Sequence, residues 1–176
     1  MSGKTPMTRA LELAREAQAA GEVPVGAVIV DGVTGAILGL ARNRTEELRD
    51  PTAHAEMLAI RSACAEAGAA RLEAADLYVT LEPCAMCAAA ISFARIRRLY
   101  FGAYDPKGGG VEHGPRFFSQ PTCHHRPEAI GGIEERESGE ILKAFFRERR
   151  SERPPCHARP ISPNARRRCR ASLHRA

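Results

Sequence analysis

The amino-acid sequence predicts an α/β fold, with a mixed sheet of about five strands and helices on both faces, in three layers. Three observations support this prediction. Short runs rich in β-branched and aromatic residues, such as 23–30 and 77–81, alternate with longer runs of helical periodicity. The turn-rich segment 31–35 predicts a hairpin, which is antiparallel, whereas a strand–helix–strand order predicts parallel pairing. The length of 176 residues suits one domain with a substantial core.

The first helix is expected to open at Thr5-Pro6, because proline is favoured at the first helical position, and to end at Gly21. The next run, 23–30, reads as a buried strand, and 36–41 reads as the strand that returns after the turn. A glycine within a strand indicates a bulge or a close backbone approach, and Gly26 is such a residue.

The middle of the chain repeats the strand and helix pattern. A charged loop over 43–50 leads into a helix that runs from His54 to about Ala67 and stops at Gly68. A strand over 76–81 feeds a second helix, rich in small residues, which ends near Ala94. The run 98–102 then predicts another short strand.

The C-terminal part is predicted to hold a long loop over 104–127, a short strand over 129–133 and a final helix over 134–150. We expect residues 1–150 to form one domain and residues 151–176 to form a basic, Pro/Arg-rich, disordered tail. Two interpretations of the tail remain open: a solvated segment with no specific role, and a weak, salt-sensitive attraction to RNA.

The net charge of +5 is unevenly distributed. Residues 147–176 hold ten arginines and two glutamates, whereas residues 1–146 carry 16 basic and 19 acidic groups. No run of about 18 apolar residues suggests a membrane span, and the N-terminus lacks the apolar centre of a signal peptide. We therefore expect a cytoplasmic protein with reduced cysteines and no membrane partner.

Two cysteines at the end of Thr80-Leu81-Glu82-Pro83-Cys84-Ala85-Met86-Cys87 predict half of a zinc site. Pro83 suits a first helical position, and on such a helix Cys84 and Cys87 stand at i and i+3, which places their sulfurs on one side. The positive end of the helix dipole favours the thiolate form that binds metal.

The segment Thr52-Ala53-His54-Ala55-Glu56 supplies an imidazole and a carboxylate at the start of the other helix. His54, Cys84 and Cys87 would be three protein ligands, and three ligands leave a fourth zinc position for water, as in catalytic sites. Glu56 would then move the proton of that water to a substrate. His-x-Glu followed by Pro-Cys-x-x-Cys is the signature of zinc-dependent base deaminases.

Other candidates are less well supported. Asn43 is either a turn residue or, because its loop runs into the His54 helix, a hydrogen-bond partner of the substrate. Cys64 is expected to be a packed core thiol. Cys123, His124 and His125 are alternatives that would complete or compete for the zinc site, although surface or substrate-side roles suit them better.

Over roughly residues 7–150, the chain resembles the bacterial tRNA adenosine deaminases of the cytidine deaminase superfamily. The strings that carry the resemblance are Glu22-Val23-Pro24-Val25-Gly26-Ala27-Val28, Asp50-Pro51-Thr52-Ala53-His54-Ala55-Glu56, Leu77 to Cys87, Phe101-Gly102-Ala103 with Asp105, and Phe145-Phe146-Arg147. Phe93-Ala94-Arg95 departs from the family's frequent His-Ser-Arg, and 108–126 differs from well-known members. Both departures concern substrate contacts rather than chemistry.

The resemblance implies a cytidine-deaminase-like fold and a homodimer that converts adenosine to inosine at the wobble position of a tRNA anticodon loop. It implies one Zn²⁺ per subunit on His54, Cys84 and Cys87, and proton transfer by Glu56. It also implies substrate binding by Asn43 and Asp105. A free-base or nucleoside deaminase acting on guanine, cytosine or cytidine would use the same zinc chemistry, and a non-catalytic zinc or RNA-binding module is the rival from another class.

Overall fold

The computed structural model describes residues 5–151. Its elements follow one another as helices and strands that largely match the predicted runs. In chain order they are α1 (Pro6–Ala19), β1 (Gly26–Asp31), β2 (Ile37–Arg42), α2 (Thr45–Leu48), α3 (Ala55–Ala67), β3 (Ala75–Leu81), α4 (Ala85–Phe93), β4 (Arg98–Ala103), the 3₁₀ turn Phe117–Ser119, β5 (Glu128–Ile130) and α5 (Glu135–Ser151).

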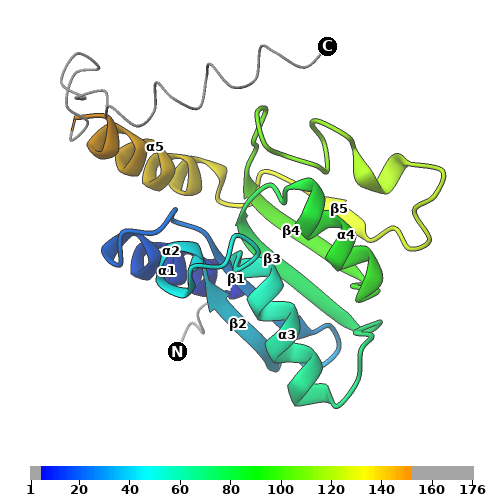
Figure 1. Cartoon of the computed structure of the whole chain (residues 1–176). Helices are drawn as coiled ribbons and strands as arrows, with labels where there is room; N and C mark the ends of the chain where they lie inside the picture. Colours follow the sequence, from blue (N-terminus) through cyan, green and yellow to red (C-terminus); the bar gives the residue numbers. More distant parts are fainter. Residues whose placement is uncertain (1–4, 152–176) are drawn as a thin grey trace, which may run out of the picture. The chain divides into compact units, whose positions relative to one another are not determined.

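Five strands form one mixed sheet in the order β2-β1-β3-β4-β5 (Figure 1). β1 pairs antiparallel with both β2 and β3, whereas β3, β4 and β5 run parallel. Helix α4 makes the crossover between β3 and β4, as a parallel pair requires. The predicted mixed α/β sheet is therefore confirmed.

Two apolar layers cover the two faces of the sheet, and β1 shows how. Its alternate residues Ala27 and Ile29 pack with α3 and α4 on one face. Val28 and Val30 point to the other face, where they pack with α1 and with Ile141 of α5. This alternation follows from the two-residue period of a strand and produces the three-layer arrangement.

Close backbone approach explains the position of Gly26, as the sequence predicted. A Cβ atom there would lie 2.1 Å from the carbonyl oxygen of Ala10, so α1 and β1 pack together only because this residue has no side chain. Strand β1 begins at Gly26 rather than at Val23, because Pro24 in the preceding segment has no N–H for a strand ladder.

Two local predictions need correction. Helix α2 lies within the segment 43–50, which the sequence predicts to be a loop. The backbone N–H groups of Glu46 and Glu47 donate to the carboxylate of Glu22, so a residue far away in the chain holds this helix in place. The zinc-motif helix begins at Ala85, with Cys84 as its N-cap, so Pro83 lies before the helix and not at its first position. The extended backbone at Cys84 accounts for this shift.

The chain divides into a compact unit over Met1–Phe145 and a second unit over Phe146–Ala176. The described residues of the second unit are the last turns of α5. The predicted tail, 151–176, lies outside the described residues apart from Ser151. Within residues 5–151, every helix is too short or too polar to cross a bilayer.

Candidate active site

Three predicted ligands meet in one cluster. The ligand atoms of His54, Cys84 and Cys87 all lie within 4.8 Å of one another. The Nδ1 atom of His54 is 3.7 Å from the Cys84 sulfur and 3.5 Å from the Cys87 sulfur. The cluster is partly buried, since the Cys87 side chain is inaccessible and the other two are half-buried.

These separations fit a zinc ion. With a Zn–N bond of about 2.05 Å, a Zn–S bond of about 2.3 Å and a tetrahedral angle, the N···S separation is about 3.6 Å. The two observed N···S distances, 3.7 and 3.5 Å, bracket this value. One imidazole and two thiolates are also a donor set that zinc prefers.

The cluster forms where two helices begin. His54 is the N-cap of α3 and Cys84 is the N-cap of α4, so the positive ends of both helix dipoles point at the site. The sheet brings the two ends together, because β3 leads into Cys84 while the segment before His54 is tied to the end of β2. That tie is a hydrogen bond from the Arg44 N–H to the Ala53 carbonyl oxygen, at 3.1 Å.

Hydrogen bonds among the two cysteines and the histidine shift their pKa values, and one of the two sulfurs is favoured as a thiolate. A hydrogen bond from Cys87 lowers the pKa of Cys84 to about 4, in spite of burial. The same hydrogen bond, together with burial, raises the pKa of Cys87. The hydrogen bond with Cys84 raises the pKa of His54. Cys84 is thus a ready thiolate, and a bound cation would displace the remaining protons.

Glu56 lies in the first turn of α3, beside the three ligands. Its carboxyl is buried and makes a hydrogen bond with Cys87. Burial raises the pKa of Glu56, which makes the carboxyl a better proton acceptor than an exposed glutamate. A buried acid–base group next to a potential metal site is the arrangement that hydrolytic deamination requires.

Asn43 lies at the end of β2 and is buried, although its loop is polar. Its side-chain amide donates to Oε2 of Glu22 at 3.3 Å, and its backbone N–H donates to the Val25 carbonyl oxygen at 3.0 Å. The neighbouring Arg44–Ala53 hydrogen bond places Asn43 beside the segment that leads into His54. Asn43 is therefore fixed by hydrogen bonds of both its backbone and its side chain, next to the segment that leads into His54.

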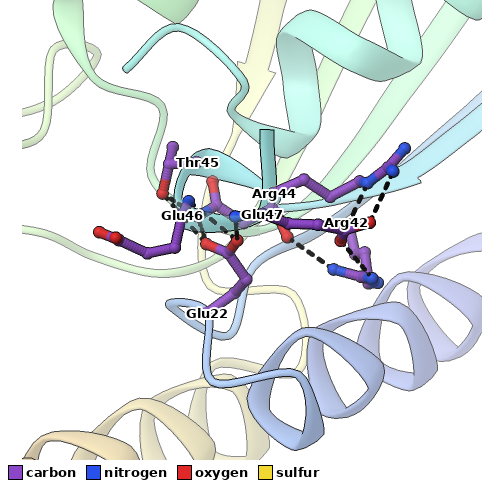
Figure 2. A network of polar contacts seen from close by, with 7 residues as sticks. Glu22, Arg42, Arg44, Thr45, Glu46 and Glu47 are labelled. Atoms are coloured by element: carbon purple, nitrogen blue, oxygen red, sulfur yellow. Dashed lines mark hydrogen bonds and ion pairs between the residues drawn. The ribbon is translucent and has the colours of Figure 1, made fainter. Parts of the chain in front are cut away.

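Glu22 organises the segment at the start of α2 (Figure 2). Its Oε1 atom accepts the backbone N–H groups of Glu46 and Glu47, both at 2.9 Å, and its Oε2 atom accepts the Thr45 hydroxyl at 3.0 Å. Burial by itself raises the pKa of Glu22, but the backbone N–H groups outweigh it and hold the pKa below its usual value. A buried carboxylate thus anchors the start of α2.

Asp105 lies in the loop after β4. Its backbone N–H donates to Oε2 of Glu82 at 3.0 Å, and Glu82 stands two residues before Cys84. Its own carboxylate accepts the backbone N–H groups of Lys107 and Gly108 at 3.1 and 3.0 Å. The structure therefore connects Asp105 to the metal-ligand segment through Glu82, and its carboxylate shapes the turn that follows.

The alternative ligands lie elsewhere. The Cys123 thiol contacts the Ser92 hydroxyl at 3.5 Å and the His125 carbonyl oxygen at 3.1 Å. The His125 ring bonds to the Ile96 carbonyl oxygen at 2.7 Å. These contacts fasten the loop to the far end of α4, and the described potential metal group comprises His54, Cys84 and Cys87 without them.

Sequence reasoning missed the roles of Glu22 and Glu82, which organise the two networks that flank the cluster. One signal was available: each glutamate stands next to a buried strand-like run and a proline. A carboxylate in such a place needs several hydrogen-bond donors, but the sequence does not say which segments supply them.

Comparison with known proteins agrees with this geometry. The family model of the cytidine and deoxycytidylate deaminase zinc-binding region matches residues 2–103. A relative from Agrobacterium fabrum, called a tRNA-specific adenosine deaminase, is 62% identical over 144 residues, which are 82% of this chain and 93% of the relative.

Solved structures show the same fold. One, from studies of A-to-I editing by tRNA:A34 deaminases at the wobble position of transfer RNA, is 61% identical. It superposes with a TM-score of 0.75 and covers 79% of this chain and all of its own. A guanine deaminase from Bacillus subtilis is 34% identical, with a TM-score of 0.57, over 85% of this chain and 95% of that one.

Proposed function

This chain belongs to the cytidine and deoxycytidylate deaminase family, and we propose that it converts adenosine to inosine at the wobble position of transfer RNA. The reaction consumes water and releases ammonia. The observation that carries the proposal is the group of His54, Cys84 and Cys87 with the buried Glu56 beside it. The 62% identity with a tRNA-specific adenosine deaminase selects the substrate within the family.

We infer that His54, Cys84 and Cys87 hold one Zn²⁺ per chain, because their donor atoms have the separations that tetrahedral zinc requires. Zinc supplies the Lewis acidity that makes a water molecule nucleophilic near neutral pH. The two thiolates also neutralise the cation's charge in a partly buried place.

Glu56 is the proposed catalytic acid–base. Its carboxylate takes one proton from the attacking water and gives it to the ring nitrogen beside the attacked carbon. It then takes the remaining proton of the new hydroxyl group and gives it to the amine, which leaves as ammonia. The carbon–nitrogen bond to the exocyclic amine breaks and a carbon–oxygen bond takes its place. The raised pKa of the buried Glu56 suits this repeated transfer.

Asn43 and Asp105 are the proposed substrate-binding residues. Both stand on loops that adjoin the ligand segments, and both loops are anchored by a buried carboxylate. An anticodon loop already presents partly unstacked bases, so flipping the target nucleotide into such a site costs little.

The decisive experiment incubates the purified protein with an unmodified tRNA and, separately, with guanine, cytosine and cytidine. Sequencing of the tRNA should read the wobble adenosine as guanosine, which marks inosine. The alternative function is deamination of a free base, because a guanine deaminase is 34% identical to this chain. Ammonia release from a small base, with an unaltered tRNA, would reject the tRNA assignment.

We further infer that the protein acts in the cytoplasm, since tRNA is a cytoplasmic substrate. We also infer that it forms a homodimer. An exposed apolar area supports the association of two chains, because the Phe93 side chain is 72% exposed. It borders a groove of about 700 Å³ that is also lined by Ile60 and Ala90, between α3 and α4. Light scattering after size exclusion should give twice the mass of one 19.1 kDa chain, and Phe93→Ser should shift the mass toward the monomer.

A further inference from the structure

Glu82 is a fully buried carboxylate whose hydrogen bonds all go to one loop. Its Oε1 atom accepts the backbone N–H groups of Val111, Glu112 and His113 at 3.2, 2.8 and 3.0 Å. Its Oε2 atom accepts the Asp105 N–H at 3.0 Å and the His113 ring Nδ1–H at 2.7 Å. One side chain therefore joins both ends of the loop 105–113.

Two glycines allow the loop to lie directly against the start of α4. The Gly110 N–H donates to the Pro83 carbonyl oxygen at 2.8 Å, and Gly109 makes a β-bridge with Cys84. A Cβ atom at Gly109 would lie 2.5 Å from the Glu82 carboxyl group, so glycine is required there. The loop consequently crosses the segment that carries a proposed zinc ligand.

The clamped loop displays groups of the kinds that bind RNA. Tyr104 is 41% exposed and packs its ring edge-on against the His113 ring, with centroids 6.1 Å apart. Asp105 and the half-buried His113 both bond to the Oε2 atom of Glu82. Aromatic and polar groups around a flipped nucleotide are typical of single-stranded RNA sites.

Three consecutive glycines, 108–110, give this loop many alternative conformations. A carboxylate that accepts five hydrogen bonds selects one of them before substrate arrives. Ordering a loop in advance removes an entropic cost from binding.

We propose that Glu82 is a positioning residue for the RNA substrate, which holds the loop 105–113 in the shape that an anticodon loop binds. The inference rests on the proposed function and deepens it. Glu82 acts through the loop, so it controls substrate binding and not the chemical step.

The test compares Glu82→Gln with the wild-type protein. The amide offers a donor in place of one acceptor, and that donor faces the Asp105 N–H or the His113 ring. The KM for tRNA should rise about tenfold or more while kcat changes by less than about threefold. The zinc content should stay at one per chain. Hydrogen exchange should speed up at the amides of Asp105, Val111, Glu112 and His113, and stay unchanged in β3.

A matched control makes the same chemical change at an exposed carboxylate. Glu73 is 64% exposed and pairs with Arg95, so Glu73→Gln should leave KM, kcat and loop exchange as in the wild type. A second variant, His113→Ala, removes the ring donor and keeps the backbone donors. It should raise KM in the same direction by a smaller factor, about threefold.

Three results would overturn the inference: wild-type KM and exchange rates in Glu82→Gln, a fall in kcat with KM unchanged, or loss of zinc. The last would show that Glu82 supports the metal site instead of the loop. The wild-type assay separates this inference from the proposed function. A wild-type protein that makes no inosine rejects the function, whereas inosine formation with an unaffected Glu82→Gln rejects only the role of Glu82.

Discussion

The Nδ1 atom of His54 lies 3.5 Å from the sulfur of Cys87, although 33 positions separate the two residues in the chain. One residue caps α3, and the other lies in the first turn of α4. The sheet creates this contact. Strands β2 and β3 lie on either side of β1 and both run antiparallel to it, so their C-terminal ends lie at the same end of the sheet. A metal-binding pair thus depends on strand order as much as on motif.

Loss of the Glu56 carboxyl should stop turnover without loss of metal. Glu56→Ala removes the group that moves the proton, so kcat should fall by about 10²- to 10⁴-fold. Mass spectrometry under native conditions should still find zinc, because Glu56 is not among the three ligands. Glu66→Ala, at an exposed site on the same helix, is the control and should keep wild-type kcat. An active Glu56→Ala protein would contradict the mechanism.

Zinc removal should abolish activity reversibly. A chelator should stop inosine formation and lower the melting temperature, because metal that binds only the folded state stabilises it. Added Zn²⁺ should restore both. Cys87→Ala should lose the metal, whereas Cys64→Ala, at a half-buried thiol outside the cluster, should keep it. Equal zinc content in the two variants would refute the assignment of the ligands.

The Glu22 carboxylate should stabilise the protein at neutral pH and not in acid. Its folded-state pKa lies below the ordinary value of 4.5, so its contribution is complete above that pH and disappears as the pH falls through the folded-state pKa. Glu22→Gln should therefore lower the free energy of unfolding by about 2 kcal/mol at pH 7. The penalty should shrink steadily below pH 4.5. Urea unfolding over a pH series measures it, and a penalty that is constant with pH would count against this account.

Two glycines should respond in opposite directions to alanine. Gly109→Ala places a methyl group 2.5 Å from the Glu82 carboxyl, and the resulting strain should cost about 1–3 kcal/mol of stability. Gly139 lies within α5 with nothing within 4 Å of the added Cβ, so Gly139→Ala should stabilise the protein by about 0.5–1 kcal/mol. Thermal unfolding of the two variants makes the comparison. Similar melting temperatures would show that the loop does not press on Glu82.

We expect the deaminase domain to end near Arg150. A chain truncated after Arg150 should fold and form inosine with a kcat close to that of the full chain. Binding to tRNA, measured against salt concentration, tests the second interpretation of residues 151–176. If the tail attracts RNA, the truncated protein should show a shallower salt dependence. A truncated protein that does not fold would contradict the domain boundary.

Several features could be predicted from sequence because they depend on neighbours in the chain. Thr5 and Pro6 start α1, and Gly68 ends α3 in the left-handed conformation that glycine favours. The ligand cluster was also predictable, since His54, Cys84 and Cys87 belong to two short motifs whose spacing is characteristic. Helix α2 was missed because Glu22, more than 20 residues earlier, supplies its anchoring hydrogen bonds.

The order of residues by itself determined the alternation of helices and strands and the identity of the metal-binding side chains, because periodicity, capping residues and motif spacing are local properties. The tertiary structure alone decided what Glu22 and Glu82 do. A buried carboxylate must find several donors, and the backbone N–H groups that reach Glu82 come from a loop more than 20 positions away. Only the packing of that loop across the start of α4 brings those donors to it.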